Sequence, residues 1–273
     1  MSERKKVGLA LGSGSAKGLV HIGVLEVLEE RRVPIDLITG SSMGSVVGAI
    51  YASGTPAKLL HQLAAQICTM DYRKIFDMTM PRKGLVRGAR VEAIIRTLTG
   101  DRIIEDLKIP YAAVATCLED CATRVFTTGK VTDAVRASLS IPGVFEPVMM
   151  DGKTYVDGGV LDRIPADVAR DMGADFVIAV DVGYQGGGRT TPKTIMDVLL
   201  SSYELMEWEV MRTRLVTADV VLAPDTRGMS LSSFNLVEEF IARGRLAALA
   251  AMEELEGKLA AADIPLLPEP TEA

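Results

Sequence analysis

A five-residue stretch of small residues, Gly40-Ser41-Ser42-Met43-Gly44, constrains the fold of this chain more than any other feature. The apolar run 35–39 before it predicts a short strand, and the small residues of 46–52 after it predict a helix. Gly-x-Ser-x-Gly between a strand and a helix is typical of a nucleophile elbow, a strained turn that exposes the serine hydroxyl. The same residues also suit a tight turn that packs a helix closely against a sheet, so the stretch alone leaves both interpretations open.

A nucleophilic serine needs a base, and the chain offers few histidines for that role. In the common triad of α/β hydrolases the base is a histidine placed after the serine in the chain. Here the only histidines are His21 and His61, and both fall in predicted helices, where a packing or surface role is the simpler interpretation. Either Ser42 is not a nucleophile, or a group other than histidine activates it.

Strands and helices alternate along the chain. Strands are predicted at residues 6–11, 35–39, 111–118, 123–127, 153–156, 176–182 and 220–223. Helices are predicted up to about residue 32 and at about 46–52, 56–70, 90–99, 131–139, 165–172, 192–215 and 234–261. This alternation predicts an α/β fold of three layers, α/β/α, with a largely parallel central sheet. No repeat or long linker divides the 273 residues, so we expect a single domain spanning 1–273.

Charge and cysteine content narrow the functional classes. The net charge of −6 and the aromatic content of 5% argue against a nucleic-acid partner, which requires a basic surface and stacking rings. Cys68, Cys117 and Cys121 are odd in number and form no disulfide framework, which fits a reducing compartment and predicts a cytoplasmic protein. Cys117 and Cys121 lack the companions of a zinc site, so no metal is expected.

The apolar segments are too short to cross a membrane. No window offers about 18 uninterrupted apolar residues, so no transmembrane helix is expected. Basic residues precede the apolar run Val7–Leu11 and imitate a signal peptide, but the run is short and a glycine-rich loop follows at once. A buried first strand explains this segment better.

The glycine loop, residues 12–18 (Gly-Ser-Gly-Ser-Ala-Lys-Gly), follows the first predicted strand and opens a helix. Such a turn presents backbone N–H groups and the positive end of the helix dipole to an anion. A dinucleotide loop would require an acidic residue at the end of the second strand, about 20 residues on. Asp36 lies near the start of that strand instead, and the Ser42 stretch occupies its end. A nucleophile candidate at that position favours an oxyanion hole.

A third loop, Asp157-Gly158-Gly159, supplies a candidate base. Asp-Gly is also a frequent hairpin turn, which is the simpler interpretation of this segment. The two glycines would allow another backbone to approach Asp157 closely. An aspartate with the unperturbed pKa of about 3.9 is a weak general base, so the proton would move as the serine attacks.

The glycine loop, Gly-x-Ser-x-Gly and Asp-Gly-Gly, in this order, resemble the patatin-like phospholipase family, and compact bacterial members above all. The resemblance covers roughly residues 6–183. It includes a segment ahead of the Asp-Gly-Gly turn, with Ser138, Ile141-Pro142, Phe145 and Pro147-Val148. It also includes the stretch 157–165 that begins at the aspartate. The C-terminal helices, about 192–261, lie beyond it.

The resemblance implies a Ser–Asp dyad without a catalytic histidine, which accounts for the missing third member of a triad. Ser42 is then the nucleophile, between Gly40 and Gly44 of the elbow, and Asp157 is its base, followed by Gly158 and Gly159. Backbone N–H groups of Ser13, Gly14 and Ser15 form the oxyanion hole, and Gly12, Lys17 and Gly18 support the loop. The implied activity is serine acyl hydrolysis of carboxylic esters of lipids, with no metal or organic cofactor.

Four residues depart from the family pattern. Ser13 and Ser15 stand where many members have glycine, which main-chain donors tolerate if φ and ψ permit. Lys17 stands where arginine is common and lacks the planar fork of a guanidinium; it braces the loop, binds an anionic headgroup or is simply solvated. Asp162 stands where asparagine is frequent, and its charge is expected to raise the pKa of Asp157.

Two further expectations concern lipid. Residues 71–89 mix apolar and basic side chains and form either a lid, or lipid-contacting lip, or an ordinary surface connection. A lipid or fatty-acyl ester is the expected substrate, and any membrane attachment is peripheral. The rival interpretation is a non-catalytic or weakly active adaptor that keeps the fold, and intact Ser42 and Asp157 argue against it. A dinucleotide-binding protein is the third alternative.

Overall fold

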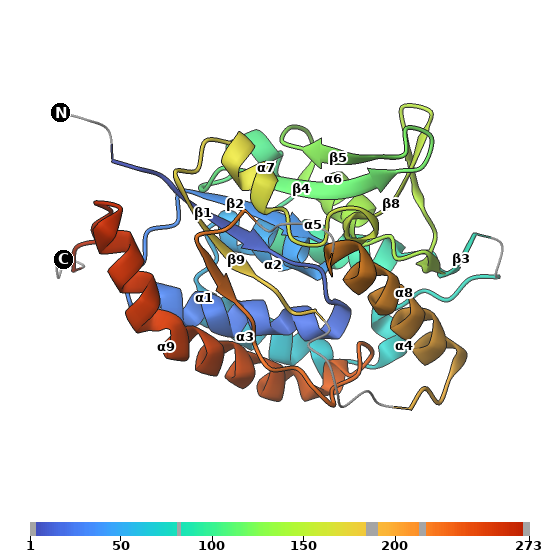
Figure 1. Cartoon of the computed structure of the whole chain (residues 1–273). Coiled ribbons are helices and arrows are strands. Elements are labelled where there is room, and N and C mark those ends of the chain that lie inside the picture. The colour runs from blue at the N-terminus through green and yellow to red at the C-terminus, as the bar shows by residue number, and fades with distance from the viewer. Residues whose placement is uncertain (1–3, 81–82, 184–190, 213–216, 270–273) are drawn as a thin grey trace.

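The computed structural model describes residues 4–80, 83–183, 191–212 and 217–269, and its centre is a twisted sheet (Figure 1). In the described residues this sheet has eight strands in the order β10-β9-β1-β2-β4-β8-β7, with β5 also paired to β4. The strands are β1 (Val7–Leu11), β2 (Leu37–Ser41), β4 (Tyr111–Cys117), β5 (Ala122–Phe126), β7 (Val148–Met150), β8 (Lys153–Asp157), β9 (Phe176–Val180) and β10 (Val220–Leu222). The β10-β9-β1-β2-β4 part is parallel, as predicted.

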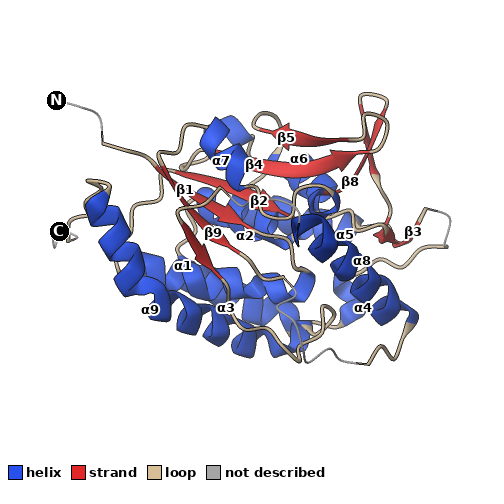
Figure 2. Cartoon of the chain, in the orientation of Figure 1, coloured by secondary structure: helices blue, strands red, loops and turns tan. Residues whose placement is uncertain are grey.

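Helices cover both faces of the sheet, so the predicted α/β layering is confirmed (Figure 2). They are α1 (Val20–Glu30), α2 (Met43–Ala52), α3 (Ala57–Cys68), α4 (Tyr72–Ile75), α5 (Ala89–Thr99), α6 (Val131–Ser138), α7 (Ala166–Asp171), α8 (Ile195–Arg212) and α9 (Val237–Ala261). Short 3-10 turns are η1 (Ser15–Leu19), η2 (Ile104–Asp106), η3 (Gly158–Val160) and η4 (Phe234–Leu236).

The two faces of the sheet are covered unequally. Successive side chains of a strand point to opposite faces. Leu9 and Leu11 of β1 therefore enter a large apolar core with α1, α2 and α9, whereas Ala10 enters a small core with α7. The small core is built mostly from alanine and valine, so α7 lies close against the sheet. Most of the buried apolar volume, and the site described below, lies on the α1/α2 side.

Helix α9 is held against α1 by a close crossing of the two backbones. A Cβ atom on Gly244 would collide with the Val20 carbonyl oxygen, and one on Gly23 would collide with the Ile241 carbonyl oxygen. Glycine at both positions therefore permits the contact. The C-terminal helix thereby covers the first helix of the chain along most of its length (Figure 1).

One edge of β4 brings two distant segments together. Its first half pairs with parallel β2, and Ser41 lies opposite Val114. Its second half pairs with antiparallel β8, and Asp157 lies opposite Ala115, the next residue along β4. The residue after Ser41 and the last residue of β8 therefore meet at the point where β2 ends.

Several element boundaries differ from the prediction. The second strand is observed at Leu37–Ser41, two residues later than predicted, and α2 begins at Met43 rather than near 46. The predicted irregular segment 71–89 contains α4 and the short strand β3 (Gly84–Val86), which pairs with β6 (Gly143–Phe145). Residues 213–215, expected at the end of a helix, lie outside the described residues.

Candidate active site

Ser42 occupies a strained turn between β2 and α2. Its backbone has φ 53° and ψ −123°, a conformation that L-residues rarely adopt and that clusters at functional sites. A Cβ atom on Gly44 would collide with the Leu11 carbonyl oxygen, so the turn lies directly against the end of β1. The Ser42 N–H donates to Ser138 Oγ at 2.9 Å. A strained residue between a strand and a helix is typical of a nucleophile elbow.

The Ser42 hydroxyl donates to Asp157 Oδ2 at 2.6 Å. The other carboxylate oxygen, Oδ1, accepts the Gly159 N–H at 2.8 Å and the Tyr203 hydroxyl at 3.0 Å. Ser42 and Asp157 are both fully buried. Three donors thus converge on one carboxylate; the sequence indicated Ser42 as a partner, but not the Gly159 N–H or Tyr203.

Burial raises the pKa of Asp157 from its ordinary value of 3.8 to about 7, and the nearby charge of Glu207 adds to this shift. The hydrogen bonds from Ser42, Gly159 and Tyr203 oppose it, because they favour the ionised form. Glu207, which comes from α8, is a carboxylate whose charge contributes to this shift, and the expected contribution of Asp162 stays a prediction. A base with a pKa of about 7 is matched to neutral pH.

The two histidines are engaged elsewhere. The His21 ring is buried, and its Nε2 lies 2.8 Å from the Gly12 carbonyl oxygen. Because a carbonyl only accepts, Nε2 carries the proton, and burial lowers the pKa of His21 to about 4. His61 of α3 lies between Glu26 of α1 and Glu238 of α9. Its two hydrogen bonds link α3 to these helices. Neither ring is hydrogen-bonded to Ser42.

The glycine loop lies against the elbow, and its backbone donors differ in their availability. The Ser13 N–H donates to the Arg163 carbonyl oxygen at 2.9 Å, so the expectation that Ser13 offers a free oxyanion donor is wrong. The N–H groups of Gly14, Ser15 and Met43 have no hydrogen-bond acceptor among the described residues. Ser15 has φ 48°, so a serine adopts the left-handed conformation here. Met43 follows the nucleophile, where an oxyanion donor is typical.

Lys17 is buried in an ion pair. Its Nζ lies 2.6 Å from Glu204 Oε1, and each side chain is 8% exposed. The alternatives of a solvated lysine and of a lysine free to bind a headgroup are therefore wrong. The loop is anchored to α8 through this pair, as its predicted bracing role requires, although the partner is one that the sequence did not indicate.

Helix α8 contributes further charged side chains behind the glycine loop. Glu207 accepts the Ser13 hydroxyl at 2.7 Å on Oε1 and the Arg163 guanidinium at 3.2 Å on Oε2. Arg163 also donates to the Ser13 carbonyl oxygen at 3.3 Å. A Cβ atom on Gly159 would collide with Glu207 Oε1, which explains why glycine stands there. Sequence reasoning missed Glu204 and Glu207 because glutamate on a helix normally faces solvent.

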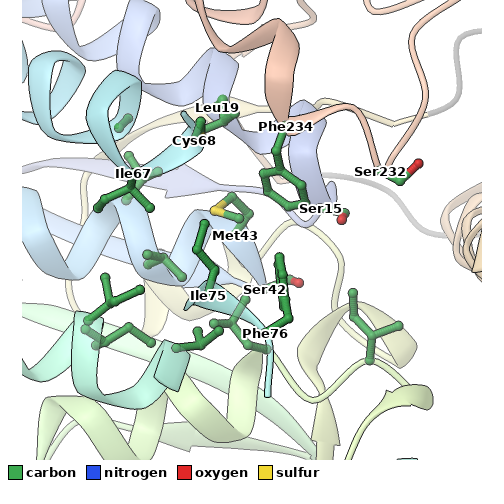
Figure 3. Close-up of a pocket in the computed structure, with 18 of the residues that line it drawn as sticks. Ser15, Leu19, Ser42, Met43, Ile67, Cys68, Ile75, Phe76, Ser232 and Phe234 are labelled. Carbon is green, nitrogen blue, oxygen red and sulfur yellow. The ribbon is translucent and has the colours of Figure 1, made fainter. Parts of the chain in front are cut away.

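An apolar cavity of about 410 Å³ begins at Ser42 and Ser15. Figure 3 shows both hydroxyls at one side of the cavity, with Leu19, Ile67 and Cys68 on the side away from Ser42. Among the helices, α2, α3 and α5 contribute the most side chains to its wall. Ile75 and Phe76 also line it, so part of the segment 71–89 covers the cavity, whereas Met78 and Met80 of the same segment are exposed.

Two searches of the described residues bear on the remaining expectations. In the described part of the chain, no helix is long and apolar enough to cross a membrane. Across the same residues, no cluster of three or more His, Cys, Asp or Glu side chains is arranged to hold a metal ion.

These observations define an α/β protein in which a paired serine and aspartate lie at the end of an apolar cavity. Residues 9–170 match the family model described as "Patatin-like phospholipase", and the chain belongs to this family. It is 38% identical over 227 residues to human patatin-like phospholipase domain-containing protein 6. These aligned residues cover 80% of this chain but 16% of that protein.

Other relatives extend the comparison. An uncharacterized NTE family protein of Mycobacterium tuberculosis is 38% identical over 187 residues, 68% of this chain and 52% of that protein. This chain thus spans about half, or much less, of the length of these relatives. The crystal structure of VipD from Legionella pneumophila superimposes with a TM-score of 0.65 at 14% identity, over 93% of this chain and 67% of that one, which shows the shared fold.

Proposed function

We propose that this protein is a serine acyl hydrolase that cleaves carboxylic esters of lipids through Ser42 and Asp157. The observation that carries the proposal is the 2.6 Å hydrogen bond from Ser42 Oγ to Asp157 Oδ2 at the end of an apolar cavity. Membership of the patatin-like phospholipase family supports lipid ester hydrolysis. Both catalytic side chains being intact argues against the adaptor alternative.

In the first half of the reaction Ser42 Oγ attacks the ester carbonyl carbon, and its proton passes to Asp157 Oδ2. The N–H groups of Gly14, Ser15 and Met43 stabilise the oxyanion, since they have no other acceptor among the described residues. The bond to the alcohol then breaks, and the leaving oxygen takes the proton from Asp157. An acyl group remains on Ser42.

In the second half a water molecule attacks the acyl carbon and gives its proton to Asp157. The second tetrahedral species releases the fatty acid, and the proton returns to Ser42 Oγ. The pKa of about 7 suits Asp157 for both transfers, because the carboxylate is a stronger base than an exposed aspartate. This sequence of steps uses no metal or organic cofactor.

The cavity and its rim support a lipid substrate taken from a membrane surface. The cavity wall is almost entirely apolar and suits an acyl chain. In the segment 71–89, which contributes Ile75 and Phe76 to the wall, Met80 is 80% exposed, and Ile195, which precedes the lining residue Met196 of α8, is 77% exposed. Lys83 of the same segment lies next to exposed Met149, so this segment, called the rim below, carries both basic and apolar side chains. We propose that this rim contacts lipid peripherally, from the cytoplasmic side. We also propose that the chain forms one domain, because α8 completes the site.

Hydrolysis of a short p-nitrophenyl acyl ester from about pH 4 to about pH 9 tests the proposal. Ser42→Ala and Asp157→Asn should both lose activity, whereas Ser53→Ala, a serine at the far end of α2, should retain it. The wild-type activity should rise with pH through about 7, the pKa of Asp157, and this limb does not come from a histidine, since Ser42 has no histidine partner. Activity that survives in Ser42→Ala would move the chemistry elsewhere. An inactive wild type, tested also on phospholipid and lysophospholipid, would favour the adaptor.

A further inference from the structure

Helix α8 buries acidic side chains and exposes apolar ones, the reverse of an ordinary surface helix. Tyr203, Glu204 and Glu207 follow one face of the helix and are 8%, 6% and 4% exposed. The opposite face carries exposed Ile195, Val198, Leu205 and Met206. Burying a carboxylate costs free energy of folding unless the group is paired. A helix that buries two carboxylates toward one site therefore requires an explanation.

Two of these side chains face Asp157 directly. The Tyr203 hydroxyl donates to Asp157 Oδ1 at 3.0 Å, on the oxygen that does not bind Ser42. Glu207 lies beside both Asp157 and Tyr203, and it is held by Ser13 Oγ and the Arg163 guanidinium. Neither residue lines the cavity, so neither is placed to contact a substrate bound there, and both face the aspartate instead.

We propose that Tyr203 and Glu207 are positioning residues that orient the Asp157 carboxylate toward Ser42 and set its affinity for a proton. The proposal rests on the proposed function, because it assigns these residues a role in that reaction. They lie on α8, beyond residues 9–170 that match the family model, so this part of the site is supplied by the C-terminal segment of the chain.

The two residues act on the base in opposite directions. The Tyr203 hydroxyl bonds to the ionised carboxylate and therefore lowers the pKa of Asp157, whereas the Glu207 charge raises it. The other groups facing Asp157 are the Ser42 hydroxyl and the Gly159 N–H, which also favour the ionised form. Arg163 faces Glu207 and offsets part of its charge.

Tyr203 has one proton and two neighbouring acceptors, Asp157 and Glu207. While Asp157 is ionised, the tyrosine donates to it and fixes its plane. When Asp157 has taken the proton of Ser42, its Oδ1 needs the bond less, and the tyrosine hydroxyl can turn toward Glu207. Tyr203 keeps its own proton throughout, so no proton leaves the site by this route.

The test is the pH dependence of kcat/KM for the p-nitrophenyl ester, with Tyr203→Phe, Glu207→Gln and Glu207→Asp. The ionised aspartate is the active form, so activity rises with pH through its pKa. We expect the acid limb of Tyr203→Phe to move up, and that of Glu207→Gln to move down, each by about one pH unit. Glu207→Asp keeps the charge and should stay nearer to wild type. Glu239→Gln, which removes an equal charge from the surface of α9, should leave the limb in place.

Opposite shifts cannot come from general destabilisation, which would lower activity at every pH. Limbs that both stay in place, or that both move the same way, would overturn the proposal. Thermal unfolding shows whether each variant is folded, and if Glu207→Gln fails to fold, an unchanged limb in Tyr203→Phe is sufficient to overturn it. An inactive wild type would instead contradict the proposed function, so the two failures are distinguishable.

Discussion

Ser42 and Asp157 are hydrogen-bonded because the strands that carry them pair with successive residues of β4. Ser41 lies opposite Val114 and Asp157 lies opposite Ala115, on the same edge. Along this edge of β4, the pairing with parallel β2 ends at Val114 and the pairing with antiparallel β8 begins at Ala115. Sheet register, rather than a flexible loop, therefore sets the distance between the two side chains. A site built on paired strands keeps its geometry more closely than a site on loops.

The buried pair between Lys17 and Glu204 leads to a prediction about stability. Lys17→Met leaves the Glu204 carboxylate buried and unpaired, and should destabilise the protein by about 3 kcal/mol. Lys17→Met combined with Glu204→Leu removes both charges and should recover most of that loss. Urea unfolding at neutral pH measures both free energies. A double variant as unstable as the single one would show that the pair is not what anchors the glycine loop.

The raised pKa of Asp157 predicts that its ionised carboxylate lowers the free energy of unfolding at high pH. The folded chain binds this proton more tightly than the unfolded chain, since the pKa is about 7 rather than 3.8. The resulting stabilisation is complete below about pH 4 and is lost as the pH rises to about 7. Asp157→Asn should therefore be more stable than wild type at about pH 8, by about 4 kcal/mol, and the difference should shrink toward about pH 4.

Urea midpoints at several pH values check this expectation, with Asp171→Asn as a control because Asp171 is exposed at the end of α7. The control should follow the wild-type curve. If Asp157→Asn is less stable than wild type at high pH, hydrogen bonding to the carboxylate outweighs the cost of its burial.

The rim beside the cavity predicts binding to anionic lipid. Charge reversal at Lys83 together with Arg82, which lies outside the described residues, should weaken binding to anionic vesicles by tenfold or more, since each basic residue near such a surface contributes about 1 kcal/mol. Sedimentation with vesicles measures the affinity, and zwitterionic vesicles should show little difference. Lys5→Glu, at the opposite end of the molecule, is the matched control (Figure 1). Unchanged binding would remove the lid and lip interpretation.

The sequence predicted the α/β layering and the order of the three loops, because each loop follows a strand with a clear apolar pattern. It did not predict β3, β6 and β7, since three residues carry too little periodicity to reveal a strand. The start of β2 was misplaced because Asp36 is not a strand residue. Its carboxylate accepts the Val7 N–H at 2.7 Å and pairs with Arg4, and so caps the start of β1.

The missing histidine and the Asp-Gly-Gly turn made Asp157 a candidate base, and the family resemblance assigned it that role, but neither indicated which groups surround it. Glu204 and Glu207 come from a helix whose glutamates resemble a solvated face. Burial and pairing, which only the tertiary structure reveals, decide their role. The same limit applies to Lys17, whose partner lies 187 residues away in sequence.

The shape of the cavity predicts a limit on acyl chain length. Ile67 lines the wall on the side away from Ser42 (Figure 3), so a larger side chain there fills the distal part and leaves the nucleophile untouched. Ile67→Trp should lower kcat/KM for long-chain p-nitrophenyl esters by tenfold or more, because a shortened pocket leaves the terminal methylenes, each contributing about 0.8 kcal/mol, in water. Activity on the acetyl ester should stay within about twofold of wild type. Ile67→Val, which keeps the pocket open, serves as the control. If the long and short esters decline together, the cavity does not hold the acyl chain, and the alcohol portion of the lipid is its occupant instead.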